Sequence, residues 1–507
     1  MTNARTVAEL LQAGAYEAPA IGAPGRPDLS HGGLRAFSGE VGARLNGFGL
    51  GRGDRVAIVA PNGPEMAAAF ITVAQAATTA PLNPAYRAEE FDFYLSDLGA
   101  RGLIVADDYD GPAVEVAARH GVAVIRLTPR AEGPAGLFDL AAGITGTPAS
   151  GGPAEADDVA LVLHTSGTTS RPKIVPLAQA NLVASARHIR DTLALEPQDR
   201  CLNIMPLFHI HGLIAAVLSS LGAGASVVCT PGFNALRFFA WLAEVKPTWY
   251  TAVPTMHQAI LARARRNAEV IAASRLRLIR SSSSSLAPQV MAELEATFGC
   301  PVIESYGMTE ASHQMASNPL PPAERKPGTV GVAAGPEVAI MAEDGRILPA
   351  GQVGEVVIRG PNVTQGYENN PKANAEGFRD GWFRTGDQGV IDEDDYLTIT
   401  GRLKEIINRG GEKISPREVD EILLDHPAVA QAVTFAVPHA RLGEDVGAAI
   451  VLREGESASE AEIKGFAAGR LADFKVPRTI LIIDEIPKGA TGKLQRIGLA
   501  EKLGLGG

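Results

Sequence analysis

The sequence contains few cysteines and few aromatic residues. Three of the 507 residues are cysteine, and Phe, Trp and Tyr together make up 5%. Cys201, Cys229 and Cys300 lie far apart, each in an apolar run. This spacing argues against a disulfide framework and against a cysteine-based zinc site. We therefore expect three buried thiols in a reducing compartment.

The sequence also lacks a hydrophobic run long enough to cross a membrane. The longest, residues 213–229, is interrupted by serines and glycines. The N-terminal residues lack the basic start and apolar core of a secretory signal, and the chain does not end in the peroxisomal signal Ser-Lys-Leu. We expect a soluble, cytoplasmic protein that does not bind membranes.

An excess of basic residues is absent as well. The 46 Lys and Arg stand against 57 Asp and Glu, which gives a net charge of −11. This balance argues against nucleic acid as a partner, so any polyanionic ligand needs a local binding device. A chain of this length exceeds the roughly 250–300 residues of one hydrophobic core, so we expect two or three domains. Nothing here predicts the oligomeric state.

The first 400 residues alternate between strand-like and helical patterns. Apolar runs at 55–60 and 102–106 predict strands, and the patterns at 64–77 and 89–98 predict helices. Such alternation indicates an α/β fold with parallel sheets covered by helices. Further predicted segments are a surface linker at 141–156, a second βα series at 159–298, and a smaller β-rich unit with strands at 338–341, 354–359 and 396–400.

The pattern changes near Gly401. Residues 403–507 predict a compact α+β unit, with a helix near 460–471 and a strand at 479–483. Ser415 and Pro416 indicate a helix start, with Ser415 at the N-cap and Glu418 reaching back to the cap amide. We therefore divide the chain into domains at 1–402 and 403–507.

One segment has the composition of a phosphate-binding loop. An apolar strand at 158–163 leads into residues 164–173, HTSGTTSRPK. Hydroxyls around a glycine, followed by two cations, can surround phosphate oxygens with donors. The spacing is not that of a Walker loop. On these residues alone, an ordinary Ser/Thr-rich surface turn is an equally good interpretation.

Seven segments, in order, resemble the signatures of the adenylate-forming superfamily, which includes acyl-CoA synthetases, luciferases and adenylation domains. They lie at residues 165–173, 205–212 (MPLFHIHG), 306–310 (YGMTE), 354–361 (GEVVIRGP), 385–387 (TGD), 401–411 (GRLKEIINRGG) and 487–493 (PKGATGK). The resemblance covers nearly the whole chain. It implies a large N-terminal domain and a small, mobile C-terminal lid.

The resemblance implies a two-step reaction. A carboxylate attacks the α-phosphate of ATP to give an acyl-adenylate, and the thiol of coenzyme A then displaces AMP. The catalytic positions that it assigns are Lys493, Glu310, Thr309 and His209. The ATP- and AMP-binding positions are Thr165, Ser166, Gly167, Thr168, Thr169, Lys173, Glu304, Tyr306, Asp387 and Arg402. Glu310 is also the expected Mg²⁺ ligand, since a hard cation prefers oxygen.

The resemblance also implies a role for each of these positions, and the chemistry of each side chain fits that role. Lys493 would bridge the attacking carboxylate and the α-phosphate. Tyr306 would lie against adenine, and Asp387 would accept the ribose hydroxyls. Lys404 matches the hinge about which the lid turns. The segment Arg409, Gly410 and Gly411 would enter the site for the CoA step.

The residues expected around the acid are polar. Five serines at 281–285 stand where many relatives have Ser-Gly-Ala-Ala-Pro, and they do not suit a fatty chain. We expect a strand at 278–286, in which alternation decides whether Ser283 or Ser284 faces the site. The candidate acid contacts are His209, Ser283, Ser284 and His313. Arg280 is as well explained by a structural ion pair.

Whole phrases, such as residues 164–173 and 406–416, look most like the oxalate–CoA ligases, so oxalate is the favoured acid. Another short acid, such as malonate or glycolate, remains an alternative. A non-catalytic nucleotide-binding relative, a module that loads a carrier protein and a luciferase-like monooxygenase are weaker ones. Ile174 departs from the family phrase Pro-Lys-Gly. The alternatives are that its β-branched side chain crowds the loop or the lid, that it slows the exit of pyrophosphate, or that it is harmless.

Overall fold

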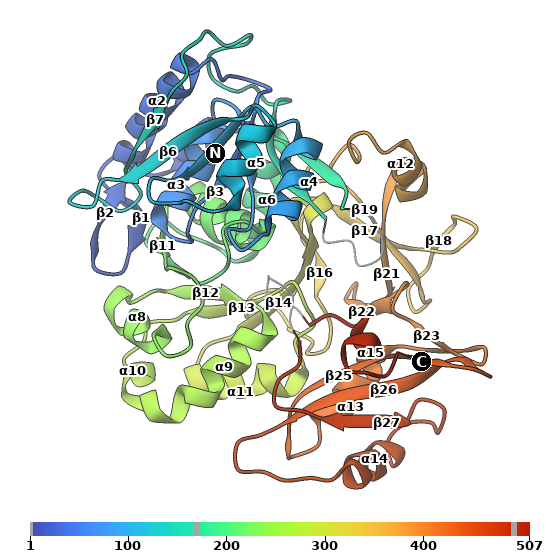
Figure 1. The fold of residues 1–507 in the computed structure, drawn as a ribbon. Helices are drawn as coiled ribbons and strands as arrows, with labels where there is room; N and C mark the ends of the chain where they lie inside the picture. Colours follow the sequence, from blue (N-terminus) through green and yellow to red (C-terminus); the bar gives the residue numbers. More distant parts are fainter. Residues whose placement is uncertain (1–3, 166–171, 488–493, 507) are drawn as a thin grey trace.

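The computed structural model describes residues 4–165, 172–487 and 494–506. These residues form two large βα units, an antiparallel sheet and a C-terminal lobe (Figure 1). All three cysteines are buried and free, as expected. Within the described parts of the chain, no helix combines the length and the apolar character that crossing a bilayer requires.

The first unit is a seven-stranded sheet with the order β7-β6-β5-β3-β4-β8-β9. Its strands are β3 (Arg55–Val59), β4 (Thr78–Pro81), β5 (Gly102–Ala106), β6 (Ala123–Pro129), β7 (Phe138–Ala142), β8 (Val159–His164) and β9 (Ile174–Ala178). Its central strands pair in parallel, whereas β7 and β9 are antiparallel edges. The helices of this region are α2 (His31–Gly47), α3 (Pro64–Ala74), α4 (Ala88–Leu98), α5 (Pro112–Arg119) and α6 (Gln179–Thr192). The strands and helices expected between residues 55 and 106 are confirmed to within a few residues.

The second unit is a nine-stranded sheet with the order β16-β15-β14-β13-β12-β10-β11-β1-β2. Its strands are β1 (Pro19–Ala23), β2 (Arg26–Ser30), β10 (Arg200–Asn203), β11 (Ser226–Cys229), β12 (Trp249–Ala252), β13 (Leu278–Ser281), β14 (Val302–Met308), β15 (His313–Ser317) and β16 (Val332–Ala333). Its helices are α1 (Val7–Leu10), α7 (Ser219–Gly222), α8 (Phe238–Val245), α9 (Pro254–Ala264), α10 (Ala268–Ala272) and α11 (Pro288–Phe298), together with short 3₁₀ turns and a π-helix, η2 (His211–Leu218).

The strand expected at 278–286 is shorter than predicted. β13 ends at Ser281, and Ser283 has a φ of +73°. The alternation of a strand therefore does not apply to Ser283 and Ser284, and the expectation was wrong on this point. The Ser282 hydroxyl donates to the carbonyl of Ser305 on β14 at 2.9 Å, directly after the end of β13.

The β-rich unit is a six-stranded antiparallel sheet. It comprises β17 (Glu337–Met341), β18 (Ile347–Leu348), β19 (Gly354–Arg359), β20 (Phe378–Arg379), β21 (Trp382–Ile391) and β22 (Leu397–Arg402), with α12 (Pro371–Gly377) before β20. Asp387 on β21 and Arg402 on β22 are cross-strand partners. The three strands predicted here are confirmed.

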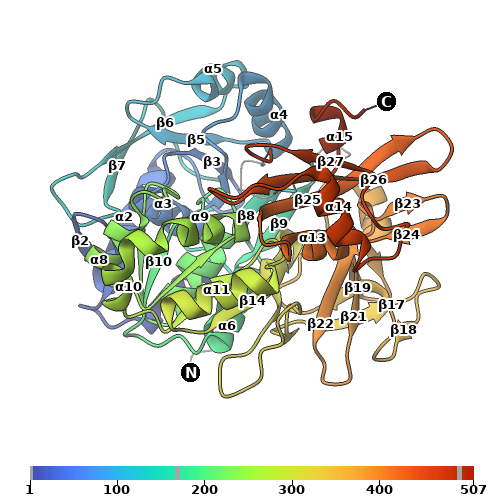
Figure 2. The same cartoon turned by 90° about the horizontal axis from the view of Figure 1, so that it is seen from below.

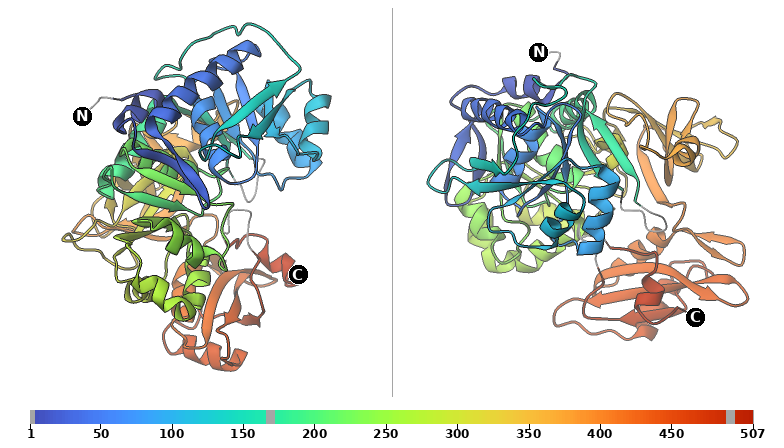
Figure 3. Two further views of the ribbon diagram at one scale, coloured as in Figure 1. Left: turned by 90° about the vertical axis from the view of Figure 1, so that its left-hand side faces the viewer. Right: turned by 45° about the horizontal axis from the view of Figure 1, so that its top comes forward.

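The C-terminal lobe, called the lid below, has its own five-stranded sheet and hydrophobic core. Its elements are β23 (Ile407–Arg409), β24 (Glu412–Ile414), α13 (Pro416–Leu424), β25 (Val429–His439), β26 (Gly443–Leu452), α14 (Glu460–Ala468), β27 (Thr479–Ile482) and α15 (Leu499–Lys502). Val419, Ile450 and Ile463 are fully buried in a cluster formed by lid residues alone. The lid is a distinct lobe at one end of the molecule (Figure 3).

The start of α13 corrects the predicted capping. Ser415 is the N-cap and Pro416 follows it, but the Ser415 side chain makes no capping bond. Its hydroxyl instead donates to the carbonyl of Thr400 on β22, and Glu418 accepts from Lys475 Nζ at 2.6 Å. Tertiary partners have replaced the local capping box.

The lid is docked on the second βα unit through α13 and β25. Arg417 donates to the carbonyl of Gly328 at 3.2 Å, and Gln258 on α9 donates to the carbonyl of Ala430 at 3.0 Å. Gln289 on α11 donates to Asp425. Figure 2 shows α13 beside α11. These contacts fix one orientation of the lid relative to the larger domain.

Candidate functional site

The carboxyl end of β8 and the start of β9 frame the predicted phosphate loop. Thr165 N donates to the carbonyl of Lys173 at 3.0 Å, and Lys173 N donates to Thr165 Oγ1 at 3.2 Å. These two bonds close the base of the segment between them. Ser166, Gly167, Thr168 and Thr169 fall outside the described residues.

Lys173, Tyr367 and Glu310 form a cluster beside this loop base. Lys173 Nζ lies 4.1 Å from the centroid of the Tyr367 ring, and the Tyr367 hydroxyl donates to Glu310 Oε1 at 2.7 Å. Burial lowers the pKa of Lys173, an effect that the Glu310 carboxylate opposes. Sequence reasoning found Lys173 and Glu310 but missed Tyr367, which lies between the signature segments at 354–361 and 385–387 and belongs to neither.

The Glu310 carboxylate suits a magnesium ion that is also bound by phosphate. Glu310 is buried, and one of its oxygens is already occupied by Tyr367. Within the described ranges, no group of three or more His, Cys, Asp or Glu residues is arranged to hold a metal. Magnesium commonly uses one or two carboxylates and takes its other ligands from substrate phosphates and water, which fits this donor set.

Tyr306, Asp387 and Arg402 meet where β14 approaches the antiparallel sheet. The Tyr306 hydroxyl donates to Asp387 Oδ2, and Arg402 Nε lies 3.2 Å from Asp387 Oδ1. Burial, together with the Asp387 carboxylate, raises the pKa of Tyr306 well above its ordinary value. The structure thus brings together three residues that the sequence assigned to the nucleoside.

Glu304 lies beneath the turn that follows β13. Its side chain is buried, and Oε1 accepts from Leu286 N at 2.9 Å. Oε2 has no hydrogen-bond partner in the described part of the chain. Burial raises the pKa of Glu304 to about 7, so a large fraction of this carboxyl is protonated at neutral pH.

His211, at the start of the π-helix η2, organises the polar residues around the expected acid site. Its Nδ1 lies 3.0 Å from Ser283 Oγ, and its Nε2 lies 2.6 Å from Thr251 Oγ1. Its ring packs edge-to-face against that of His313, with centroids 4.9 Å apart. π-Helical turns often mark functional sites. The sequence singled out His209 and not His211, although both occur in the same motif.

Arg280, the third residue of β13, lies against these two histidines. Its side chain is fully buried. Nη1 is 3.4 Å from His211 Nε2, while Nη2 is 3.5 Å from His313 Nδ1 and 3.3 Å from Gln314 Oε1. Its Nε has no hydrogen-bond partner among the described residues.

Arg280 forms no ion pair with any carboxylate of the described ranges, so the structural ion pair considered from the sequence is wrong. Burial lowers the pKa of Arg280 to about 9. The guanidinium therefore stays charged at neutral pH, without a compensating anion from the described chain. A buried cation of this kind is costly unless an anion approaches it.

The other candidate acid contacts separate into two groups. Ser283 and His313 belong to the Arg280 and His211 cluster, whereas Ser284 is exposed. His209 is partly buried, and its Nδ1 accepts from His211 N at 3.2 Å. Thr309 begins the short turn that carries Glu310.

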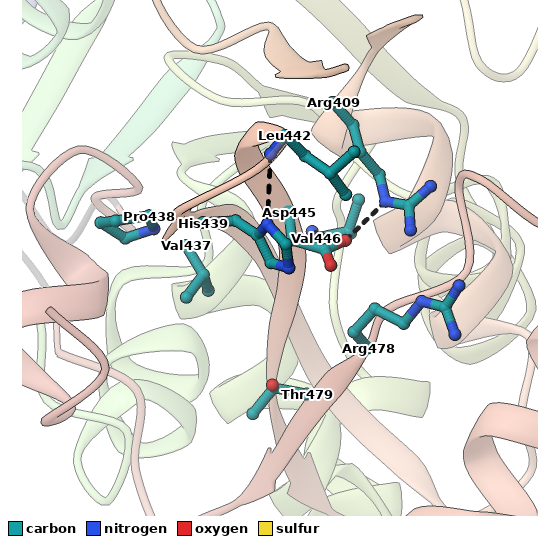
Figure 4. Close-up of a pocket in the computed structure, with 9 residues that line it drawn as sticks. All are labelled: Arg409, Val437, Pro438, His439, Leu442, Asp445, Val446, Arg478 and Thr479. Atoms are coloured by element: carbon teal, nitrogen blue, oxygen red, sulfur yellow. Dashed lines mark hydrogen bonds and ion pairs between the residues drawn. The ribbon is translucent and has the colours of Figure 1, made fainter. Parts of the chain in front are cut away.

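The lid residues assigned to the hinge and the CoA step lie on or next to the small hairpin of β23 and β24. Lys404 is exposed in the turn before β23, and Gly410 and Gly411 form the hairpin turn with positive φ angles. Arg409 forms an ion pair with Asp445, 2.6 Å away, and both line a lid cavity of about 440 Å³ (Figure 4). Lys493 lies outside the described residues.

Comparisons with known proteins agree with this arrangement. Residues 12–368 match the family model described as AMP-binding enzyme, and residues 418–493 match the AMP-binding enzyme C-terminal domain. The chain is 46% identical to an oxalate–CoA ligase from Arabidopsis thaliana, with 94% of each chain covered. It is 44% identical to an oxalate–CoA ligase from Saccharomyces cerevisiae, with 89% of this chain and 87% of that protein covered.

Among solved structures, the chain is similar to MatB from Rhodopseudomonas palustris at 31% identity, with 98% of each chain covered. The TM-score is 0.87 for the ATP-bound crystal structure and 0.78 for the apo crystal structure of the same protein. The present arrangement is therefore more similar to the ATP-bound form.

Proposed function

Because the chain belongs to the AMP-binding enzyme family, we propose that it is an ATP-dependent acid–thiol ligase that converts oxalate to oxalyl-CoA. In the first step, a carboxylate oxygen of oxalate attacks the α-phosphorus of ATP. The bond to the β-phosphate breaks, and pyrophosphate leaves. In the second step, the sulfur of coenzyme A attacks the acyl carbon, AMP leaves, and the thiol proton is released.

The observation that carries the choice of acid is the buried charge of Arg280. An acid with one carboxylate reacts with ATP through that carboxylate, so no negative charge is left to pair with the guanidinium of Arg280. Oxalate has another carboxylate, which would meet the positive potential behind His211, His313 and Ser283. The oxalate–CoA ligases at 44% and 46% identity support the same acid.

The nucleotide is proposed to lie between the loop base and the antiparallel sheet. Thr165, Lys173 and Thr309 would donate to phosphate oxygens. Asp387 would exchange its contact with the Tyr306 hydroxyl for the ribose hydroxyls, leaving the Tyr306 ring for adenine. Magnesium, when bound at Glu310, supplies charge stabilisation on the phosphates.

Residues 1–402 and 403–507 are proposed to act as a body and a lid. Lys493, carried by the lid, would stabilise the charge that develops as oxalate attacks ATP. A turn about Lys404 would then exchange Lys493 for the segment Arg409 to Gly411 in the CoA step. The greater similarity to the ATP-bound form of MatB supports an orientation that precedes this turn.

A second candidate is ligation of another short acid. The cluster around Arg280 favours a second anionic group and does not by itself exclude malonate. Glycolate, with a hydroxyl in place of the second carboxylate, would leave the guanidinium uncompensated. These acids are therefore the comparison substrates.

The proposal is tested by incubating the purified chain with ATP, Mg²⁺, CoA and oxalate, and identifying the products by chromatography and mass spectrometry. Oxalyl-CoA, AMP and pyrophosphate are expected. Omitting CoA should leave slow pyrophosphate release as adenylate accumulates. Formation of ADP in place of AMP, or thioester formation only with medium-chain acids, would overturn the proposal.

A further inference from the structure

We infer that Gln314 is a specificity-determining residue, because its neutral amide beside Arg280 leaves the guanidinium charge for the second carboxylate of the acid. This inference rests on the proposed function and adds a requirement to it. The preference for a dianion depends on the absence of a carboxylate at position 314 as well as on the presence of Arg280.

The hydrogen bonds of Gln314 fix the orientation of its amide. The side chain is fully buried on β15. Nε2 donates to Thr192 Oγ1 at 3.0 Å and to the carbonyl of Ala334 at 3.1 Å. Because a carbonyl oxygen only accepts, the amide nitrogen must face Ala334, and Oε1 must face Arg280.

The contact with Arg280 is therefore a hydrogen bond without charge compensation. Oε1 accepts from Nη2 at 3.3 Å. The other groups within hydrogen-bonding distance of the Arg280 guanidinium are ring nitrogens of His211 and His313, which also carry no negative charge. All the described neighbours hold the guanidinium in place, but none neutralises it.

Glutamate at position 314 would have nearly the same shape and would change this balance. Its carboxylate would pair with Arg280 inside the protein, so the second carboxylate of oxalate would enter a site that is already neutral. Oxalate would then lose its charged partner, whereas a mono-acid would lose nothing comparable. The expected effect is on the ratio between the two acids and not on catalysis in general.

The test compares two variants, Gln314→Glu and Gln314→Met, in the full-length enzyme. Steady-state kinetics would be measured with oxalate and with glycolate, following pyrophosphate release with CoA present. Q314E should lower kcat/KM for oxalate by about 100-fold or more and change that for glycolate by less than about tenfold, while Q314M should keep the oxalate preference. The KM for ATP and the melting temperature report on folding.

The outcomes separate the inference from the proposed function. A wild-type chain that makes no oxalyl-CoA defeats the proposed function. Wild-type activity on oxalate, with Q314E and Q314M losing oxalate and glycolate activity equally, overturns the inference and leaves the function standing. If Q314E does not fold, Q314M decides alone: loss of the oxalate preference in this uncharged variant shows that neutrality at position 314 is not what matters.

Discussion

Replacing Arg280 by methionine should stabilise the protein and abolish its use of oxalate. The guanidinium is fully buried, and burial lowers its pKa to about 9. At about 1.4 kcal/mol per pKa unit, holding the charge in the fold costs about 5 kcal/mol at neutral pH. Removing it leaves Gln314 Oε1 without its donor, which costs about 1–3 kcal/mol. The net expectation for Arg280→Met is a gain of about 2–4 kcal/mol.

The assay is thermal unfolding of the wild type and of Arg280→Met, each with and without ATP and oxalate. Without ligands, the variant should melt at least about 2 °C higher than the wild type. With ligands, the wild type should gain stability because the second carboxylate compensates the guanidinium, whereas the variant should gain only what ATP contributes. The kcat/KM for oxalate should fall by about 100-fold or more in the variant.

The opposite result would refute this reasoning. If Arg280→Met melts several degrees lower and retains activity on oxalate, the guanidinium is a structural group whose charge is compensated within the fold. Arg280→Lys serves as a matched control: it keeps a cation but loses the planar fork of donors, so it should lose activity without the gain in stability.

Three further predictions concern other parts of the chain. Lys493→Ala should abolish adenylate formation while thioester formation from supplied oxalyl-adenylate survives, and equal loss of both steps would contradict the proposed role. Ile174→Gly should lower the free energy of unfolding by about 3 kcal/mol or more, measured by denaturant titration, because Ile174 is buried in the core of the first βα unit; faster turnover without loss of stability would contradict this. Burial raises the pKa of Glu304 to about 7, above its value in the unfolded chain, so stability is lost as pH rises through 5–7 and stays lower above that range. Glu304→Gln should match the wild type near pH 5 and exceed it by about 3 kcal/mol at pH 8, and a constant difference across this range would rule out titration of Glu304 as its cause.

The parts of the fold that follow from local periodicity could be predicted from the sequence. Buried strands such as β3 and β5 are short apolar runs. A parallel sheet buries both faces of each strand, so the limits of an apolar run predict the limits of the strand. The lid helices could be predicted because their apolar residues recur at the helical period and form one buried face. The change of pattern near Gly401 predicted a division of the chain at residues 402 and 403, and this division stays a prediction.

The features that depend on tertiary contacts could not be predicted. The serines after β13 look like a strand in sequence, but β13 ends at Ser281, and the Ser282 hydroxyl bonds to the carbonyl of Ser305 on β14. Ser415 has the local signature of a cap, yet its hydroxyl bonds to β22. In both cases a serine hydroxyl donates to a backbone carbonyl that is distant in the sequence and not to a local partner.

The residues of the candidate site that belong to sequence motifs could be predicted. The residues that only tertiary packing brings to the site could not. Tyr306, Asp387 and Arg402 come from three separate segments. The resemblance of these segments to known signatures assigned all three residues to one nucleotide site. Thr251 and Gln314 carry no such signal, and His211 lies in a signature segment in which nothing distinguishes it from His209. Each of these three residues becomes informative only through its position around Arg280. The sequence alone did not explain why Ile174 departs from the family phrase, and in the structure its side chain is buried in the core of the first βα unit.

The measurement that tests the central claim most directly is the ratio of kcat/KM for oxalate to kcat/KM for glycolate in the wild-type enzyme. The two acids have nearly the same size and differ in the second carboxylate. If the buried charge of Arg280 selects the acid, oxalate should be favoured by about 100-fold or more, because glycolate leaves a buried cation uncompensated. A ratio near one, or a preference for glycolate, would contradict the account.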